Sequence, residues 1–261
     1  MPFTLAHPAA VLPLRGVWRL RMAPLIVGAM APDVPDYLPG GLGRYVAVTH
    51  RFAHSLTIDL LLGYLVLAAL FVLQRPLTAL LLPRARALCL CALAPFGRAS
   101  EWALAAPAIV LGIWSHLLWD SFTHPEGWMV QRIAALNAPL VLGPWQGSVY
   151  HALQYVSSVV GLCVLAVWYG CLPAPARESR RDAARSAAMP VLLLALTAAL
   201  LIGSVQAVVQ FGHTHSVYLT IDVLLTHGIA WFGALYLIAG VVLTLDQRPA
   251  ERTPELPAGG G

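Results

Sequence analysis

PVLLLALTAALLIGSVQAVVQF occupies residues 190–211 and contains no charged side chain. An α-helix needs about 20 consecutive, mostly apolar residues to cross the hydrocarbon core of a bilayer. Four further stretches are also mostly apolar, at residues 56–73, 102–122, 149–171 and 217–245. The sequence therefore predicts an all-α fold, a polytopic integral membrane helical bundle with about five transmembrane helices.

The overall composition favours the same class. Hydrophobic residues make up 59% of the 261-residue chain and charged residues only 11%, whereas soluble proteins average about 25% charged residues. All 16 basic residues are arginine, and they lie in the gaps between the apolar runs. A nucleic-acid-binding protein would instead gather them into a basic patch, so we expect membrane lipids and no nucleic acid as partners.

The segments outside these spans are expected to be short helices, loops and a tail. Residues 22–31 are apolar, but Pro32, Pro35 and Pro39 follow closely, so a short helix should give way to an irregular segment. Residues 88–95 are too short to span and are predicted to form an interfacial helix. We expect one membrane-embedded domain over residues 1–246 and a disordered, Pro/Gly-rich tail over residues 247–261.

The arginine distribution predicts the orientation. With five spans, the Arg-rich segments 74–101, 173–189 and 246–261 fall on one side, and the opposite loops contain only Arg132. Cytoplasmic loops carry the excess of basic residues, so these segments are placed in the cytoplasm of a bacterium, with the chain in its inner (cytoplasmic) membrane. Five arginines before residue 56 fall on the outer side, and a partial or full crossing by residues 16–38 would move the first three of them, Arg15, Arg19 and Arg21, inside.

A chain so poor in ionisable groups carries nine histidines, and several have helical spacing. His116 and Asp120 are four apart at the end of the 102–122 span and share one helix face. His124 follows one turn later. An imidazole and a carboxylate at this spacing can bind one cation together, as in helix-borne zinc sites.

A second polar group precedes the first span. His50 and His54 are four apart just before residue 56, and Asp33 and Asp36 lie shortly upstream. Alternating topology places this group on the membrane face where His124 lies, the non-cytoplasmic one. Each residue alone is more often an interfacial or hydrogen-bonded side chain, but buried ionisable groups in membranes are costly and tend to pair or serve function. The group therefore predicts one shared metal site.

Three motifs resemble a known family. They are MPFTLAHPAA at residues 1–10, GAMAPD at 28–33 and HLLWDSFTHPEGW at 116–128. They resemble a family of uncharacterised bacterial membrane proteins, the domain of unknown function 4184, most clearly over residues 1–172. That family is similar to membrane-bound metal-dependent hydrolases, and its polar pattern resembles the zinc-dependent phospholipase C enzymes.

The resemblance implies a set of zinc ligands: His7, Asp33, His54, His116, Asp120 and His124. The phospholipases have a later HxxxE pair that this sequence lacks, so His151, or His213 and His215, would substitute, or one metal is absent. His50 is a further, weaker candidate. We expect one to three ions of Zn²⁺, with Mn²⁺ or Fe²⁺ as the alternatives.

The function predicted from this ligand set is metal-dependent hydrolysis of an ester or phosphoester, with a lipid-linked or other small amphiphilic substrate. The metal would lower the pKa of a bound water toward about 7, and Asp36 is the carboxylate predicted to take the proton. The competing functions are a non-catalytic membrane protein with a structural metal site and a transporter component. Almost wholly apolar span centres disfavour ion conduction.

Overall fold

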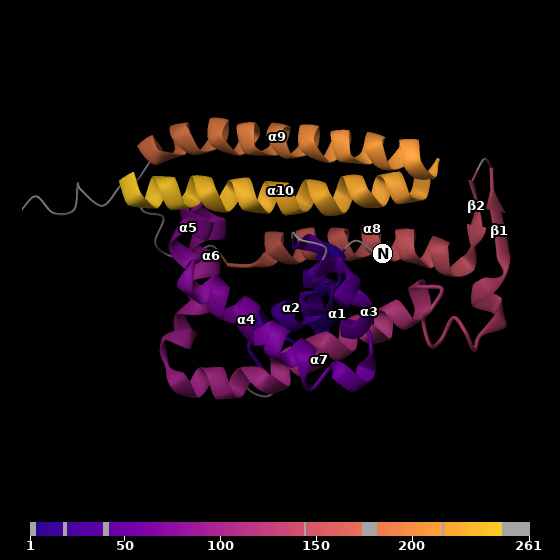
Figure 1. Ribbon diagram of the computed structural model, residues 1–261. Coiled ribbons are helices and arrows are strands. Elements are labelled where there is room, and N and C mark those ends of the chain that lie inside the picture. The colour runs from indigo at the N-terminus through magenta and orange to yellow at the C-terminus, as the bar shows by residue number, and fades with distance from the viewer. Residues whose placement is uncertain are drawn as a thin grey trace, which may run out of the picture. The chain divides into compact units, whose positions relative to one another are not determined.

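The computed structural model describes residues 4–17, 20–38, 42–143, 145–173, 182–215 and 217–246. Nearly all regular structure among them is helical, which confirms the all-α class (Figure 1). They divide into two compact units, Met1–Phe71 with Cys91–Ala174, and Val72–Leu90 with Pro175–Gly261. The single domain expected over residues 1–246 stays a prediction, and the expected tail lies outside the described residues.

Four of the described helices are long and apolar enough to cross a membrane. They are α7 (Ala99–Thr123) and α8 (Val149–Cys171) in the first unit, and α9 (Asp182–Thr214) and α10 (Val217–Asp246) in the second. The remaining predicted span is α4 (Ile58–Val72), which has 15 residues. At 1.5 Å per residue it rises about 22 Å, less than the ~30 Å hydrocarbon core. The protein is thus a multi-pass membrane protein with four candidate spans among its described residues.

Short helices make up the N-terminal part of the first unit. They are η1 (Thr4–Ala6), α1 (Pro8–Val11), η2 (Leu12–Leu14), α2 (Met22–Met30), η3 (Ala31–Tyr37), η4 (Leu42–Tyr45), α3 (Val46–Thr49) and η5 (Phe52–His54). Pro32 and Pro35 lack the N–H that an α-helix needs, and the chain passes from α2 into the tighter 3₁₀-helix η3 at this point. The short helix expected after residue 22 is therefore present, and a 3₁₀-helix follows it.

The packing of α2 against α7 forms the core of the first unit. A Cβ added to Gly28 would lie 2.1 Å from the carbonyl oxygen of Ile109, and one added to Gly112 would lie 2.3 Å from that of Leu25. Glycine thus lets the two backbones touch, as small residues commonly do between membrane helices. Leu25 and Ile109 are fully buried in this contact.

An ion pair fixes the direction of α2. The guanidinium of Arg21 donates from Nε and Nη2 to the two carboxylate oxygens of Glu101, each at 3.1 Å. Arg21 precedes α2 and Glu101 lies in the first turn of α7, so α2 runs parallel to α7 toward its C-terminal half. With nine residues, α2 covers only about half of the ~30 Å hydrocarbon core.

The remaining elements are short. The second unit contains α5 (Gln74–Ala79) and most of α6 (Pro83–Leu93), and the first unit contains η6 (Ala94–Gly97), η7 (Ala134–Asn137) and the strands β1 (Pro139–Leu142) and β2 (Trp145–Ser148). The strands pair antiparallel, with Pro139 opposite Ser148. The sequence analysis did not predict this hairpin, because four-residue strands are too short to show an alternating pattern.

The second unit is built on a pair of long helices, α9 and α10, which lie side by side (Figure 1). They approach closely where Gly203 meets Gly228, and nearby His227 Nδ1 lies 2.9 Å from Gln206 Oε1. Tyr236 of α10 donates a hydrogen bond to the carbonyl oxygen of Leu77 in α5. Small residues and interhelical hydrogen bonds are the usual means of holding membrane helices together.

Candidate metal centre

Four side chains from three segments of the first unit converge on one point. Asp33 comes from η3, His50 follows α3, and His116 and Asp120 lie one turn apart on α7. One ligand atom from each of the four lies within 4.8 Å of all the others. The structure therefore contains a group of His and Asp residues able to hold a metal ion, which supports the metal site predicted from the sequence.

Five of the six distances between the four ligand atoms are close to those of a tetrahedral ligand shell. His50 Nε2 lies 3.2 Å from Asp33 Oδ1 and 3.2 Å from Asp120 Oδ2. The corresponding distances from His116 Nε2 are 3.5 and 3.1 Å, and the two Nε2 atoms are 3.3 Å apart. Ligand atoms bound at ~2.0–2.1 Å to one tetrahedral zinc ion are about 3.3 Å from each other. One such ion fits among these atoms.

Backbone carbonyls fix both imidazoles in the orientation that a metal requires. His116 Nδ1 lies 2.9 Å from the carbonyl oxygen of Ala29, and His50 Nδ1 lies 2.9 Å from that of Val46. A carbonyl only accepts, so each Nδ1 carries the proton and donates it. Metal-bound histidines in proteins are held in the same way, with the other ring nitrogen left for the metal. In both residues the free nitrogen is Nε2, which points into the cluster.

Asp33 is oriented by residues near the N-terminus. Thr4 Oγ1 donates to Asp33 Oδ2 at 2.6 Å and also lies 2.6 Å from the hydroxyl of Tyr37. Thr49 Oγ1 donates to the carbonyl oxygen of Pro32 at 2.7 Å and so ties η3 to α3. These contacts use one oxygen of Asp33 and leave Oδ1 facing the histidines.

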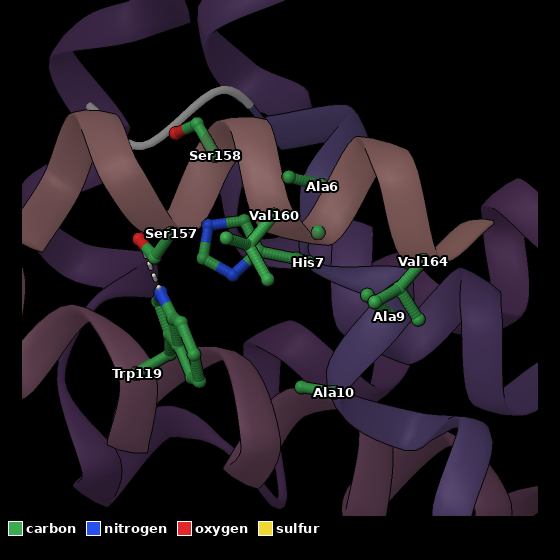
Figure 2. Close-up of a pocket in the computed structure, with 10 residues that line it drawn as sticks. Ala6, His7, Ala9, Ala10, Trp119, Ser157, Ser158, Val160 and Val164 are labelled. Atoms are coloured by element: carbon green, nitrogen blue, oxygen red, sulfur yellow. Dashed lines mark hydrogen bonds between the residues drawn. The ribbon is translucent and has the colours of Figure 1, made fainter. Parts of the chain in front are cut away.

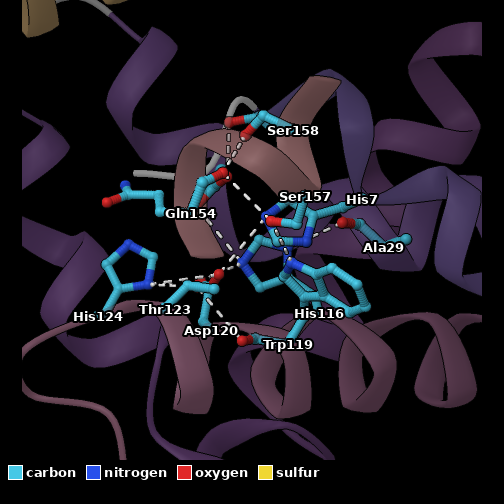
Figure 3. Close-up of polar contacts among 12 residues, drawn as sticks. His7, Ala29, His116, Trp119, Asp120, Thr123, His124, Gln154, Ser157 and Ser158 are labelled. Atoms are coloured by element: carbon cyan, nitrogen blue, oxygen red, sulfur yellow. Dashed lines mark hydrogen bonds and ion pairs between the residues drawn. The ribbon is translucent and has the colours of Figure 1, made fainter. Parts of the chain in front are cut away.

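The second oxygen of Asp120 faces another pair of histidines (Figure 3). Asp120 Oδ1 lies 3.5 Å from His7 Nε2 and 3.4 Å from His124 Nδ1. The backbone of His124 is extended, as expected for a residue before proline, and α7 ends there. The ring of His7 stacks on His116, with centroids 4.0 Å apart. Asp120 therefore lies between two groups of imidazoles, with one oxygen toward each.

Polar atoms in this second group are buried without hydrogen bonds. Neither ring nitrogen of His7 has a hydrogen-bond partner, and Asp120 Oδ1 has none. Leaving a buried polar atom unsatisfied costs about 1–3 kcal/mol, and native structures contain few such atoms. An orphaned imidazole nitrogen beside an orphaned carboxylate oxygen fits a position for a cation or a bound water.

The pKa shifts of the cluster residues that lie outside α7 suit metal binding. Burial, together with the charge of His116, lowers the pKa of His7 to about 3, so its ring is neutral at pH 7. Burial opposes the charged form of His50, but hydrogen bonds with Asp120 and Asp33 raise its pKa to about 10. Burial likewise disfavours the Asp33 carboxylate, yet His116 and His50 lower the pKa of Asp33 to about 2. A divalent cation would balance two carboxylates and displace the proton of His50.

The cluster is open on one side. The side chains of His116 and Asp33 are 0% and 2% exposed, whereas those of His50 and His124 are 22% and 24% exposed. Water can therefore reach the group past His50 and His124.

The structure brings together only one residue of the first histidine pair with the other candidates. His50 lies in the cluster and His54 does not, although the sequence analysis favoured His54. The two are four apart, but α3 ends at Thr49 and Arg51 is extended. Residues at this spacing share a face only when one helix carries both, and here α3 ends just before His50 while His54 lies in the separate 3₁₀-helix η5.

The other predicted residues are placed as follows. Asp36 is half-buried, lies one 3₁₀ turn after Asp33 and is close to Gly43. His151 lies in the first turn of α8, with its ring against Tyr150, and is not part of the cluster. His213 and His215 are exposed at the end of α9, in the second unit.

Asp59 is a candidate that the sequence analysis left outside the site. Its carboxylate is fully buried in the first turn of α4, and neither oxygen has a hydrogen-bond partner. It interacts electrostatically with His50 and His116. A carboxylate inside an apolar helix is costly and often functional, and that signal was present in the sequence.

Comparison with protein families identifies the chain. The family model for the domain of unknown function 4184 matches residues 1–245. The chain belongs to this family. No curated protein and no solved structure matches it.

In this member of the domain of unknown function 4184 family, all residues of the cluster lie inside the matched range. The family resemblance drawn from three motifs is thereby confirmed, and it extends beyond the 1–172 range where the motifs are clearest. The more distant relation to metal-dependent hydrolases and to phospholipase C stays a prediction.

Proposed function

We propose that the protein is a membrane-bound hydrolase that uses divalent metal ions, zinc in the first instance, to cleave an ester or phosphoester. The observation that carries the proposal is the convergence of His50 and His116. Their Nδ1 atoms donate to carbonyls, so two Nε2 atoms meet at 3.3 Å between two buried carboxylates. Without a metal, one of the two rings must carry a proton between these nitrogens, and a shared cation takes the place of that proton.

Asp120 divides the proposed centre into two positions. Asp33, His50, His116 and Asp120 Oδ2 form a four-ligand shell, which is typical of a structural zinc site. His7, His124 and Asp120 Oδ1 offer three ligands, and catalytic zinc sites keep three protein ligands with the fourth position open. We assign the catalytic role to the second position, where the orphaned nitrogen of His7 lies.

The chemistry needs an activated water and a proton acceptor. A metal ion in the open position supplies a bound water with a pKa near about 7 and polarises the oxygen of the scissile group. Asp36, half-buried one turn beyond Asp33, is our proposed proton acceptor. The exposed edges of His50 and His124 leave room for the hydrophilic part of the substrate.

One observation favours the competing, non-catalytic function. The four-residue shell of Asp33, His50, His116 and Asp120 is closed and almost wholly buried, and such a site can serve stability alone. The two functions differ in the second position, because a purely structural centre has no need of an open site at His7 and His124.

Metal binding is expected to release the proton of His50 at pH 7. With a pKa of about 10, His50 is protonated in the metal-free protein, and a metal ligand must give up its proton. His7 and Asp33, with pKa values of about 3 and 2, release none. Affinity should therefore rise with pH, by up to about tenfold per unit below pH 10.

The measurement is calorimetry of zinc binding in buffers of different ionisation enthalpy. His54→Gln is the matched control, because His54 lies four residues from His50 and outside the cluster. Zinc binding to this variant should release the same proton. Zinc binding without proton release, or with affinity independent of pH, would contradict the assignment of His50 as a ligand.

We further propose that the protein lies in the bacterial inner membrane with its cluster on the non-cytoplasmic side. The support is the arginine bias of the loops, together with the Arg21–Glu101 pair at the opposite end of α7 from Asp120. Because Glu101 lies in the first turn of α7, the pair supports a cytoplasmic position for Arg21, one of the arginines that the arginine bias alone would put on the outer side.

Cysteine labelling with a membrane-impermeant maleimide is expected to modify Ser148→Cys from the periplasm and Ser100→Cys only after the membrane is opened. Ser100 lies in the first turn of α7, and Ser148 directly precedes α8. The four native cysteines are exposed and must first be replaced by serine. Labelling of both positions from the same side would reject the topology.

A further inference from the structure

A narrow cavity adjoins the cluster at His7 (Figure 2). Its volume is about 190 Å³ and it is lined by α1, α7 and α8. Drug-sized ligands occupy pockets of about 300–1,000 Å³, so this space suits only a slender ligand or a part of one. Small side chains create it, namely those of Ala6, Ala9, Ala10 and Gly161.

The lining is apolar, and its polar side chains bond to protein atoms. Trp119 Nε1 donates to Ser157 Oγ at 3.2 Å, and Ser157 and Ser158 both donate to the carbonyl oxygen of Gln154. The donors of these three side chains are thus in use. His7 is different, because both of its ring nitrogens lack hydrogen bonds although the side chain is almost completely buried.

His7 is therefore shared between the cavity and the metal centre. Its ring forms part of the cavity wall, while its Nε2 lies 3.5 Å from Asp120 Oδ1. A ligand that filled the cavity would present its polar end to the cluster and its apolar part to α1 and α8. Such a ligand must be amphiphilic.

We propose that this cavity holds one hydrocarbon chain of a membrane lipid whose ester or phosphoester group lies at His7 and Asp120. This deepens the proposed function, on which it rests, by naming a lipid as the substrate class. Two of the cavity walls, α7 and α8, are candidate membrane spans, so lipid chains surround them. The hydrocarbon chain gains little free energy by leaving lipid for an equally apolar groove. The ligand is therefore selected by the contacts of its headgroup with the cluster.

The test is photo-crosslinking of the full-length protein in phosphatidylcholine nanodiscs that contain a phospholipid with a diazirine in its acyl chain. Labelling is expected to concentrate on the α1 residues of the cavity, Ala9 and Ala10, which are only partly exposed, and to be competed by the same lipid without diazirine. Labelling spread evenly over the exposed faces of α8 would overturn the proposal, since that pattern reports only surrounding lipid.

Filling the cavity gives a matched pair of variants. Val160→Phe places a large ring in the cavity and should abolish the concentrated labelling, and Ala10→Phe should do the same from α1. Val159→Phe is the control, because Val159 is the adjacent residue of α8, is 62% exposed and does not line the cavity. Equal labelling in Val160→Phe and Val159→Phe would overturn the proposal.

Two further arms separate this inference from the hydrolase proposal. Asp120→Ala should lose metal and turnover and weaken the concentrated labelling, because the headgroup contacts that select the lipid are lost while the cavity walls remain. Concentrated labelling in a protein that hydrolyses nothing supports the lipid cavity and rejects the hydrolase. Metal-dependent turnover of a water-soluble phosphoester, without concentrated labelling, supports the hydrolase and rejects the lipid cavity.

Discussion

Replacing Asp120 with alanine is expected to remove bound metal and all metal-dependent hydrolysis. Asp120 Oδ2 lies 3.1 Å from His116 Nε2 and Oδ1 lies 3.5 Å from His7 Nε2, so one substitution takes a ligand from both positions. Changes to residues that only orient ligands already cost 10–100-fold in metal affinity or activity, and losing a shared charged ligand should cost more than about 100-fold. The measurements are metal content by mass spectrometry and turnover of a phospholipid and phosphomonoester panel, with and without chelator.

Two control variants make the result specific. Ser121→Ala changes the adjacent residue of α7, whose hydroxyl bonds only to the backbone carbonyl of Leu118, and it should keep metal and rate. Asp36→Asn should keep the metal and lose rate if Asp36 takes the proton. Hydrolysis that survives both chelation and Asp120→Ala would show that the cluster is structural, and the non-catalytic function would then be the better one.

The positions of the long helices, and which residues share a face within one helix, were predictable from the sequence. Long apolar runs identify membrane helices because every backbone polar group in lipid must bond within its own segment. Four of the five predicted spans therefore reappear as long helices at nearly the predicted residues, and α4 as a shorter one. His116 and Asp120 were placed on one face of α7 because helical periodicity alone decides that relation.

Where helices end could not be predicted as well. The equal spacing of His50 and His54 suggested one face, and only the extended backbone at Arg51 separates them. A one-residue change in a helix end alters which histidine enters the site, and helix ends are the least certain part of any assignment from sequence. The selection of His50 over His54 is therefore a property of the turn and not of the histidine pattern.

Contacts between segments that are distant in the chain were the hardest to predict from the sequence. The hydrogen bond from Thr4 to Asp33 and the carbonyl of Ala29 that holds His116 join residues far apart in the chain. Nothing in the local sequence marks Thr4 or Ala29 as part of a site. The apolar cavity beside His7 likewise depends on how α1 meets α8, and alanine and glycine residues give no pattern that predicts it.

Substituting valine for Gly28 is expected to destabilise the first unit and to disturb the metal centre from a distance. A Cβ at this position would lie 2.1 Å from the carbonyl oxygen of Ile109, so α2 and α7 must move apart. Overpacking typically costs 1–3 kcal/mol, and a clash with backbone should reach the upper end, about 3 kcal/mol or more. The shift also moves the carbonyl of the adjacent Ala29 away from His116 Nδ1.

Two readouts follow from this coupling, the thermal unfolding midpoint and zinc affinity. Gly28→Val should lower both, because the contact that packs the helices also orients a ligand. Gly170→Val is the control for adding a β-branched residue to a membrane helix. A Cβ at Gly170 would meet nothing within 4 Å. This variant should therefore leave the unfolding midpoint and the zinc affinity near their wild-type values. A Gly28→Val protein that unfolds earlier but binds zinc with unchanged affinity would show that the helix contact serves stability alone, and that His116 keeps its orientation without the carbonyl of Ala29.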